Sequence, residues 1–233
     1  MTQVKHALIT GAAGGLGHHL VRVFAHAGYH VYACDLVLGG NPCPEIPGGE
    51  FHPLDVRSPE SVAAVAERVT LEAGSLDVLV NAAAILPANS ARILEEFDIE
   101  DSLRVFDVNA LGALRMTKAF LPLLEKGEDK MIVNLSSEAG SMTTHANYTI
   151  RYDYCMSKAA LNIQTIILQR YLKPRGIKLL AVHPGWMRTS MGGEKAPVEP
   201  ADSAAGILAL AQKYKGRTDD LIYVDYDGTP RAW

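Results

Sequence analysis

Short, continuous apolar runs alternate along the chain with longer segments of helical periodicity. Strands buried on both faces of a parallel sheet have this apolar character, and the alternation favours helices on both faces of one sheet. The sequence therefore predicts a doubly wound, three-layer α/β fold with a parallel sheet, in a single domain over residues 1–233. The predicted strands are 6–10, 30–35, 50–54, 76–83, 130–137, 177–184 and 221–225, and the predicted helices are 16–27, 58–73, 102–125, 152–172 and 200–213.

Composition excludes several classes of protein. Apolar residues make up 48% and charged residues 21% of 233 residues, which suits a folded core rather than a disordered chain. The net charge of -4 and the lack of a Lys/Arg block argue against nucleic-acid or anionic-membrane partners. Cys34, Cys43 and Cys155 have no CxxC spacing, so neither a disulfide framework nor a metal site is expected. With no signal peptide or membrane span at the N-terminus, we expect a cytoplasmic protein.

A glycine-rich turn joins the first predicted strand to the first predicted helix. The segment "LITGAAGGLGHHL" has the spacing G-x-x-x-G-x-G, with Gly11, Gly15 and Gly17 in the motif. Glycine lets the backbone turn tightly and approach a ligand closely, and a helix N-terminus attracts a pyrophosphate. The turn predicts a Rossmann-like dinucleotide site, although glycines in a tight turn alone are weak evidence.

Asp35 ends the second predicted strand, where an acid binds the ribose hydroxyls of NAD. A phosphate on that ribose would be repelled by the carboxylate, and the glycine turn contains no Arg or Lys. The sequence therefore predicts NAD as the cofactor, with NADP as the alternative. Asp35 at a strand end would also be compatible with simple surface exposure.

Tyr154 and Lys158 lie four residues apart at the start of a predicted helix. Residues with this spacing share a helix face, so both side chains are expected in one pocket. A nearby ammonium favours the phenolate, so Lys158 is expected to lower the pKa of Tyr154. Tyr154 is then our candidate for the general acid and base.

These segments together resemble the short-chain dehydrogenase/reductase family over essentially the whole chain. The matching segments are "TGAAGGLG" (10–17), "LDV" (54–56), "NAAA" (81–84), "DVNALG" (107–112), "NLSSEAG" (134–140), "YCMSK" (154–158) and "HPGWMRT" (183–189). "NAAA" departs from the family's usual N-N-A-G. The C-terminal "YVDYDGTPRAW" and the long separation of Ser137 from Tyr154 are similar to the C-factor-like carbonyl-reductase branch.

The resemblance implies an NAD(P)(H)-dependent oxidoreductase that interconverts an alcohol and a carbonyl on a small molecule. It implies the catalytic residues Asn109, Ser137, Tyr154 and Lys158. Ser137 would donate a hydrogen bond to the substrate oxygen, Asn109 would hold a water near Lys158, and Asp55 would contact adenine. The cofactor-binding residues implied are Gly11, Gly15, Leu16, Gly17, Asp35, Asp55, Val56, Asn81, Ala82, Ala83, Tyr154, Lys158, Pro184, Gly185 and Thr189.

Residues 186–200, rich in Gly, Pro and Met, are expected to form a mobile substrate-binding loop after a strand end. Residues 145, 147, 148, 151 and 152 precede Tyr154 and either contact substrate or lie exposed. The family resemblance also implies a homodimer or homotetramer. The alternative function is a non-catalytic dinucleotide-sensing or signalling protein on the same fold, which would need only the glycine turn and Asp35.

Overall fold

The computed structural model describes residues 4–36, 49–143, 148–217, 219–220 and 222–233. Seven strands form one parallel sheet in the order β3-β2-β1-β4-β5-β6-β7. The predicted doubly wound fold is therefore confirmed. The strands are β1 (Lys5–Thr10), β2 (Tyr29–Asp35), β3 (Gly49–Pro53), β4 (Val78–Asn81), β5 (Met131–Leu135), β6 (Lys178–His183) and β7 (Tyr223–Asp225).

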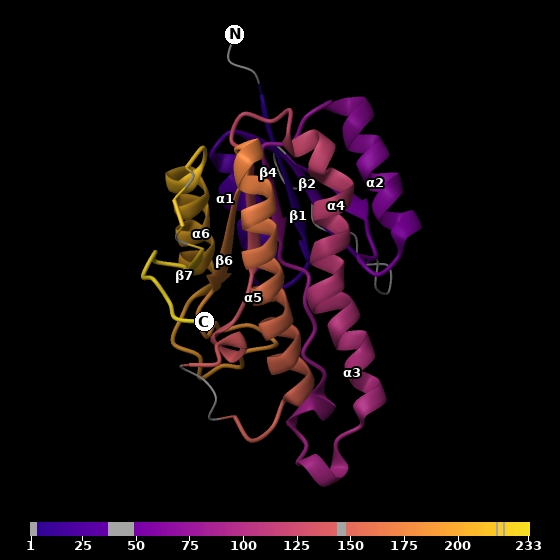
Figure 1. The fold of residues 1–233 in the computed structure, drawn as a ribbon, viewed down its shortest axis with the longest axis vertical. Helices are drawn as coiled ribbons and strands as arrows, with labels where there is room; N and C mark the ends of the chain where they lie inside the picture. The colour runs from indigo at the N-terminus through magenta and orange to yellow at the C-terminus, as the bar shows by residue number, and fades with distance from the viewer. Residues whose placement is uncertain (1–3, 37–48, 144–147, 218, 221) are drawn as a thin grey trace.

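Helices cover both faces of the sheet, which makes three layers (Figure 1). The α-helices are α1 (Gly17–His26), α2 (Pro59–Glu72), α3 (Ile99–Phe106), α4 (Ala113–Leu124), α5 (Tyr152–Leu172) and α6 (Pro200–Tyr214). The shorter helices are η1 (Ala88–Ala91), η2 (Leu94–Glu96), η3 (Asp107–Gly112), η4 (Glu138–Gly140) and η5 (Lys173–Arg175).

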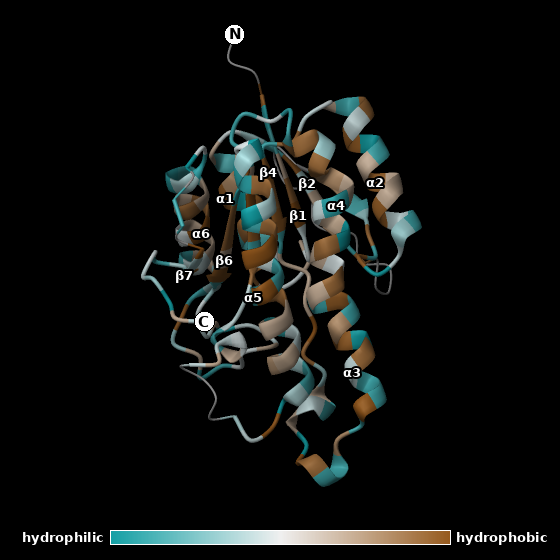
Figure 2. Ribbon diagram, viewed as in Figure 1, coloured by the Kyte–Doolittle hydropathy of each residue, from teal (hydrophilic) through white to brown (hydrophobic). Residues whose placement is uncertain are grey.

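The core is split into two apolar layers because successive residues of each strand point to opposite faces. Ala7 and Ile9 of β1 belong to the layer that α1 and α6 cover. Leu8, between them, belongs to the layer beneath α2, α4 and the end of α5. Figure 2 shows the same arrangement as brown strands between helices of mixed colour.

The strand order reverses at β1, which pairs with β2 on one side and with β4 on the other. The connections from β1 and β4 therefore leave the sheet in opposite directions and open a crevice at its carboxyl edge. The glycine turn after β1 and the segment after β4 line this crevice, so the topology places the predicted cofactor residues together.

The predicted helix over 102–125 is interrupted by one π-helical segment, η3, which separates α3 from α4. Asn109 lies inside η3, where its side-chain amide donates to Ile85 O (3.0 Å) and accepts from Ile85 N (2.8 Å). These two bonds tie the helix to the chain that follows β4. A π segment shifts the helical register, and such segments are frequent at functional sites. Apolar periodicity does not reveal a shift of this size, so the sequence predicted one continuous helix.

Other differences from the predicted elements are at boundaries. The segment between the predicted strand 76–83 and the predicted helix 102–125 contains η1, η2 and the start of α3. β4 is shorter than the predicted strand 76–83, and β7 begins at Tyr223. Residues 37–48, which include Cys43, lie outside the described residues, and so do the candidate contacts His145 and Asn147.

Helix α5 has a polar buried face and an apolar exposed face. Its buried side chains include Ser157, Lys158, Asn162, Thr165 and Gln169. Its exposed side chains include Met156, Ile163, Ile167 and Tyr171. Although α5 has 21 residues, neither it nor any other described helix is long and apolar enough to cross a membrane. Hydrogen bonds therefore hold the helix to the sheet alongside the apolar packing of Leu161 and Leu172.

Candidate active site

The turn between β1 and α1 presents backbone rather than side chains to the crevice. Gly11 has a φ of +69°, a conformation that favours glycine. A Cβ on Gly17 would lie 1.9 Å from Gly11 O, so no side chain fits there. No side chain caps the N-terminus of α1 at Leu16. The amide groups at the start of α1 are therefore placed as in a pyrophosphate site.

A cleft of about 550 Å³ runs from this turn along the carboxyl edge of the sheet to α5. The cleft extends from the glycine turn to α5, and the glycines leave room for a ligand close to the backbone. Both features fit a dinucleotide. The predicted cofactor residues that line it are Gly11, Gly15, Leu16, Gly17, Asp35, Asp55, Val56, Ala82, Ala83, Tyr154, Lys158, Pro184 and Thr189. Most of the predicted cofactor set is therefore brought together by the fold.

Two carboxylates lie in the cleft in different electrostatic settings. Asp35 accepts hydrogen bonds from Ala13 N (2.8 Å) and Leu36 N (2.7 Å) and has no cationic partner among the described residues. Asp55 is paired with Arg57, and that pair lowers the pKa of Asp55. Asp35 is therefore the carboxylate whose charge is left to act on a bound ligand.

Ser136 and Ser137 follow β5, and the structure distinguishes their hydroxyls. The Ser136 hydroxyl donates to Asn162 Oδ1, a bond inside the protein. The Ser137 hydroxyl accepts from Ala139 N (3.1 Å), and the Ser137 side chain acts on the Tyr154 phenol so as to lower its pKa. The structure thus pairs Tyr154 with Ser137, the serine that the sequence predicted.

The predicted electrostatic role of Lys158 is wrong in this structure. Burial raises the pKa of Tyr154 to about 12, and the Ser137 side chain opposes that rise without overcoming it. Lys158 Nζ lies 5.8 Å from the centre of the Tyr154 ring, and it does not contribute to the shift. The cation that acts on the phenol is Arg151, which lowers the pKa by a smaller amount than burial raises it. The phenol is therefore neutral near neutral pH.

Lys158 is only 2% exposed, and burial lowers the pKa of its ammonium to about 8. Its Nζ donates to Leu135 O (2.8 Å), at the end of β5. No carboxylate pairs with it among the described residues. An ammonium without a counter-charge in a buried site is placed to bind polar oxygens of a ligand in the cleft.

Asn109 supports this site from outside the cavities. Its Nδ2 donates to Ser157 Oγ (3.1 Å), and Ser157 Oγ donates to Tyr154 O (2.8 Å). Asn109 lines neither the cleft nor the second cavity described below. Asn81 also lies outside the cleft lining, because its amide donates to Asn134 Oδ1 (2.8 Å).

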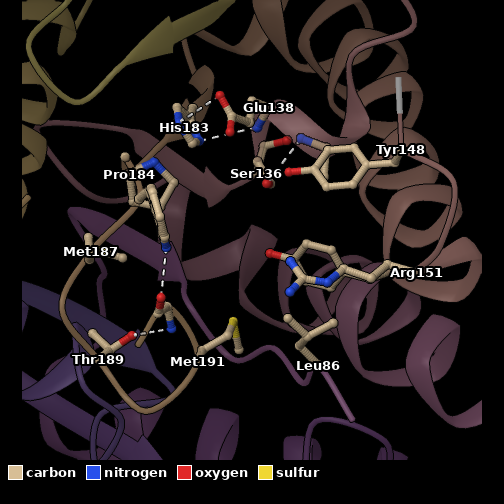
Figure 3. Close-up of a pocket in the computed structure, with 16 residues that line it drawn as sticks. Leu86, Ser136, Glu138, Tyr148, Arg151, His183, Pro184, Met187, Thr189 and Met191 are labelled. Atoms are coloured by element: carbon tan, nitrogen blue, oxygen red, sulfur yellow. Dashed lines mark hydrogen bonds and ion pairs between the residues drawn. The ribbon is translucent and has the colours of Figure 1, made fainter. Parts of the chain in front are cut away.

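A second cavity, of about 350 Å³, opens beside the cleft (Figure 3). Tyr154 lines both cavities, so its side chain lies where they join. Apolar walls come from Leu86, Trp186, Met187 and Met191, the last three from the predicted substrate-binding loop. Gly185, which was predicted to bind the cofactor, lines this second cavity instead of the cleft.

Several residues that line the second cavity were missed or left undecided by the sequence. Leu86, Glu138 and His183 were not singled out, because they become neighbours only when separate strands and loops meet. Tyr148 and Arg151 line the cavity, whereas the Tyr152 hydroxyl donates to Thr149 O (2.8 Å) and does not. Within the described ranges, no group of three His, Cys, Asp or Glu side chains is arranged to hold a metal ion.

Comparison with known proteins agrees with this geometry. A family model described as "short chain dehydrogenase" matches residues 5–199. The chain is 37% identical to C-signal of Myxococcus xanthus over 164 residues, which cover 69% of this chain and 94% of that protein. It is 33% identical to oxidoreductase UcpA of Salmonella typhimurium over 216 residues, which cover 90% and 79%.

Among solved structures, the chain is similar to an NADPH-bound carbonyl reductase from chicken fatty liver. The TM-score is 0.86 at 28% sequence identity, and the match covers 100% of both chains. The similarity in fold therefore extends over the whole chain, and the family model covers residues 5–199 of it.

Because the Lys158 ammonium is buried, we expect the folded protein to become more stable when a substitution removes this charge. A fall in pKa from 10.5 to about 8 corresponds to a cost of about 3 kcal/mol for keeping the charge in the folded protein near neutral pH. Lys158→Met is therefore expected to raise the free energy of unfolding. The loss of the hydrogen bond to Leu135 O makes this increase smaller. Chemical denaturation measures this change.

The sign of the pH dependence makes the test specific. Between about pH 8 and 10.5, unfolded wild-type protein binds more protons than folded protein, so the wild type gains stability as pH rises. The advantage of Lys158→Met is expected to shrink over that range, whereas exposed Lys126→Met should show no such trend. A variant less stable than the wild type by the same amount at every pH would contradict the burial cost.

Proposed function

The chain belongs to the short-chain dehydrogenase/reductase family, and we propose that it is an NAD(H)-dependent oxidoreductase that interconverts a carbonyl group and an alcohol on a small molecule. Membership supports an NAD(P)-dependent oxidoreductase. One observation carries the proposed chemistry: Tyr154 stands where the cleft and the second cavity meet, and Ser137 lines the second cavity with it. We assign the cleft to the cofactor and the second cavity to the substrate.

In this proposal, Tyr154 transfers the proton at the substrate oxygen and Ser137 donates a hydrogen bond to the same oxygen. A nicotinamide ring, when bound, supplies or accepts the hydride. The hydroxyl of Ser137 stabilises negative charge that develops on the oxygen. Because Tyr154 is a neutral phenol near neutral pH, it is ready to protonate that oxygen. The neutral phenol is the protonation state that carbonyl reduction needs.

Lys158 and Asn109 take supporting roles. The Lys158 ammonium lies in the cleft lining and is placed to bind ribose hydroxyls of the cofactor. Asn109, through Ser157, fixes the first turn of α5 and so the position of Tyr154. Asn109 was also expected to hold a water near Lys158. Its main-chain atoms would have to bind that water, because its side chain is bonded to Ile85 and Ser157.

Residues 186–200 form part of the substrate site in this proposal. Trp186 Nε1 donates to Gly192 O (2.7 Å), and Arg188 N donates to Val198 O (3.0 Å), so the segment is folded back on itself. Its Met187 and Met191 side chains face both cavities. That this segment moves on ligand binding stays a prediction. The same holds for a single catalytic domain over residues 1–233 and for a cytoplasmic location.

Removal of the Tyr154 hydroxyl tests the chemistry. Tyr154→Phe is expected to lower kcat for carbonyl reduction by about a hundredfold or more, because proton transfer at the substrate oxygen is lost. NADH binding, followed by its fluorescence, should change little. Tyr152→Phe is the matched control, since the Tyr152 hydroxyl is bonded to Thr149 O outside both cavities.

The assay uses a panel of small aldehydes and ketones with both reduced cofactors. Turnover by Tyr154→Phe within about tenfold of the wild type would contradict the assigned role. A wild-type protein that binds NADH tightly but reduces none of the compounds would favour the sensing or signalling alternative.

Removal of the Asp35 charge tests the cofactor preference. The carboxylate has no cationic partner in the part of the chain that the structure describes, so it should repel a 2′-phosphate, even though the similar chicken protein is bound to NADPH. The wild type is expected to favour NADH over NADPH by about tenfold or more in kcat/KM. Asp35→Asn keeps the side-chain shape and should largely abolish that preference. A wild type that favours NADPH by about tenfold would overturn the interpretation of Asp35.

We further propose a homodimer through α4 and α5. Exposed apolar side chains on this face include Leu114, Ile163, Ile167 and Tyr171, and Figure 2 shows brown residues along both helices. Exposed apolar patches of this kind mark interfaces.

A charge placed on this face tests the interface. Ile167→Glu is expected to weaken self-association by about tenfold or more, because it places a carboxylate in an apolar contact. Analytical ultracentrifugation measures the dissociation constant. Leu71→Glu is the control, because Leu71 is 80% exposed on α2, which is not one of the two helices of the proposed interface. Equal effects of the two substitutions, or a monomeric wild type, would contradict the proposal.

A further inference from the structure

Arg151 is held in an unusual backbone conformation at the entrance to α5. Its φ of 66° and ψ of 40° lie in the left-handed region, which glycine adopts without strain. The conformation is fixed from both sides: Arg151 N donates to Ser90 O (2.8 Å), and Arg151 O accepts from Cys155 N (3.0 Å). The buried Ser90 hydroxyl also donates to Asp153 (2.7 Å). A strained non-glycine residue over-determined by its surroundings is typical of functional sites.

The side chain of Arg151 forms no hydrogen bond or ion pair with the described residues. It makes no cap bond to α5 and no ion pair with a described carboxylate. The undescribed residues beside it, 144–147, include no Asp or Glu. Many other arginines of the chain are paired with a carboxylate, namely Arg57, Arg68, Arg115, Arg175, Arg188, Arg217 and Arg231.

The guanidinium lies in the proposed substrate cavity, near the proposed general acid. Figure 3 shows Arg151 and Tyr148 extending from the same side of the cavity towards its centre. Tyr154 follows Arg151 by three residues, so the two side chains share one end of α5. Arg151 acts electrostatically on the Tyr154 phenol, as its effect on the pKa shows.

The remaining charges around the cavity leave Arg151 as its source of positive potential. Glu138 lines another wall, where Arg231 (3.4 Å) and His183 (3.7 Å) lie against its carboxylate. Asp153 is buried and bonded to Ser90 and to Tyr154 N. The N-terminus of α5 adds a partial positive charge at the same place. A guanidinium beside apolar walls binds a carboxylate more strongly than one in water.

We propose that Arg151 binds a carboxylate of the substrate, so that the site acts on oxo acids and the corresponding hydroxy acids. This inference rests on the proposed function and deepens it by naming the substrate class. The carboxylate would lie on Arg151 while the carbonyl oxygen meets Tyr154 and Ser137. The apolar walls at Leu86, Trp186 and Met191 would take the hydrocarbon part of the substrate.

Turnover of matched acids and esters tests the proposal. The substrates are benzoylformate, benzoylacetate and 3-benzoylpropionate, each paired with its methyl ester, so that the carboxylate stands at three distances from the carbonyl. For at least one pair, the wild type is expected to favour the acid by about tenfold or more in kcat/KM. Arg151→Gln should lower that acid-to-ester ratio by a similar factor, whereas exposed Arg170→Gln should leave it unchanged.

Two outcomes overturn the proposal: no pair in which the wild type favours the acid, or an unchanged ratio in Arg151→Gln. Arg151→Gly guards against misfolding, because glycine suits the left-handed conformation and the variant should unfold at no lower temperature than the wild type. Its acid-to-ester ratio should fall like that of Arg151→Gln.

A binding measurement separates this inference from the proposed function. In a Trp233→Phe background, Trp186 is the only tryptophan, and it lines the cavity. Benzoate is expected to quench its fluorescence and bind about tenfold more tightly than benzamide, a difference that Arg151→Gly abolishes. Arg151-dependent benzoate binding without any turnover would refute the proposed function alone. Equal binding of benzoate and benzamide would refute the carboxylate site.

Discussion

The hydrogen bond from Lys158 to Leu135 O is the contact on which the site depends. It joins the first turns of α5 to the end of β5, two residues before Ser137. With this bond in place, Tyr154 and Ser137 come from different elements yet meet at one point. The bond keeps a cation where the site needs it, at the cost of desolvating a charge that has no counter-ion.

That cost is offset by the polar layer beneath α5. Asn134 bonds to both Asn81 and Thr165, and Asn162 bonds to Ser136 and Gly140 O. A buried network of this kind restricts the arrangement of its members, because a shift would break hydrogen bonds away from water. The helix therefore approaches the sheet in a fixed register, which apolar packing alone would define less sharply.

The sequence was sufficient for features that depend on local pattern, and insufficient for those that depend on burial. The apolar runs located the strands, and the spacing of Gly11 to Gly17 located the cofactor turn. Tyr154 and Lys158 both line the cleft, but the predicted direction of the phenol's pKa was wrong, because desolvation outweighs the effect of the Arg151 cation. The π segment at Asn109 and the left-handed Arg151 were invisible for a related reason: both are imposed by contacts with Ile85 and Ser90, far along the chain.

The N-terminal end of α5 contributes side chains to both cavities. Its first turn carries Arg151 and Tyr154 towards the substrate cavity, and Lys158, one turn later, faces the cofactor cleft. Because side chains three and four apart share a face, a single helix end presents a guanidinium to one cavity and an ammonium to the other. Neither cation has a carboxylate partner among the described residues; the guanidinium lies nearest the proposed substrate, and the ammonium lies nearest the proposed cofactor. Tyr154 stands between them, so a proton donor that burial keeps neutral is flanked by two cations that attract oxygen atoms of its ligands.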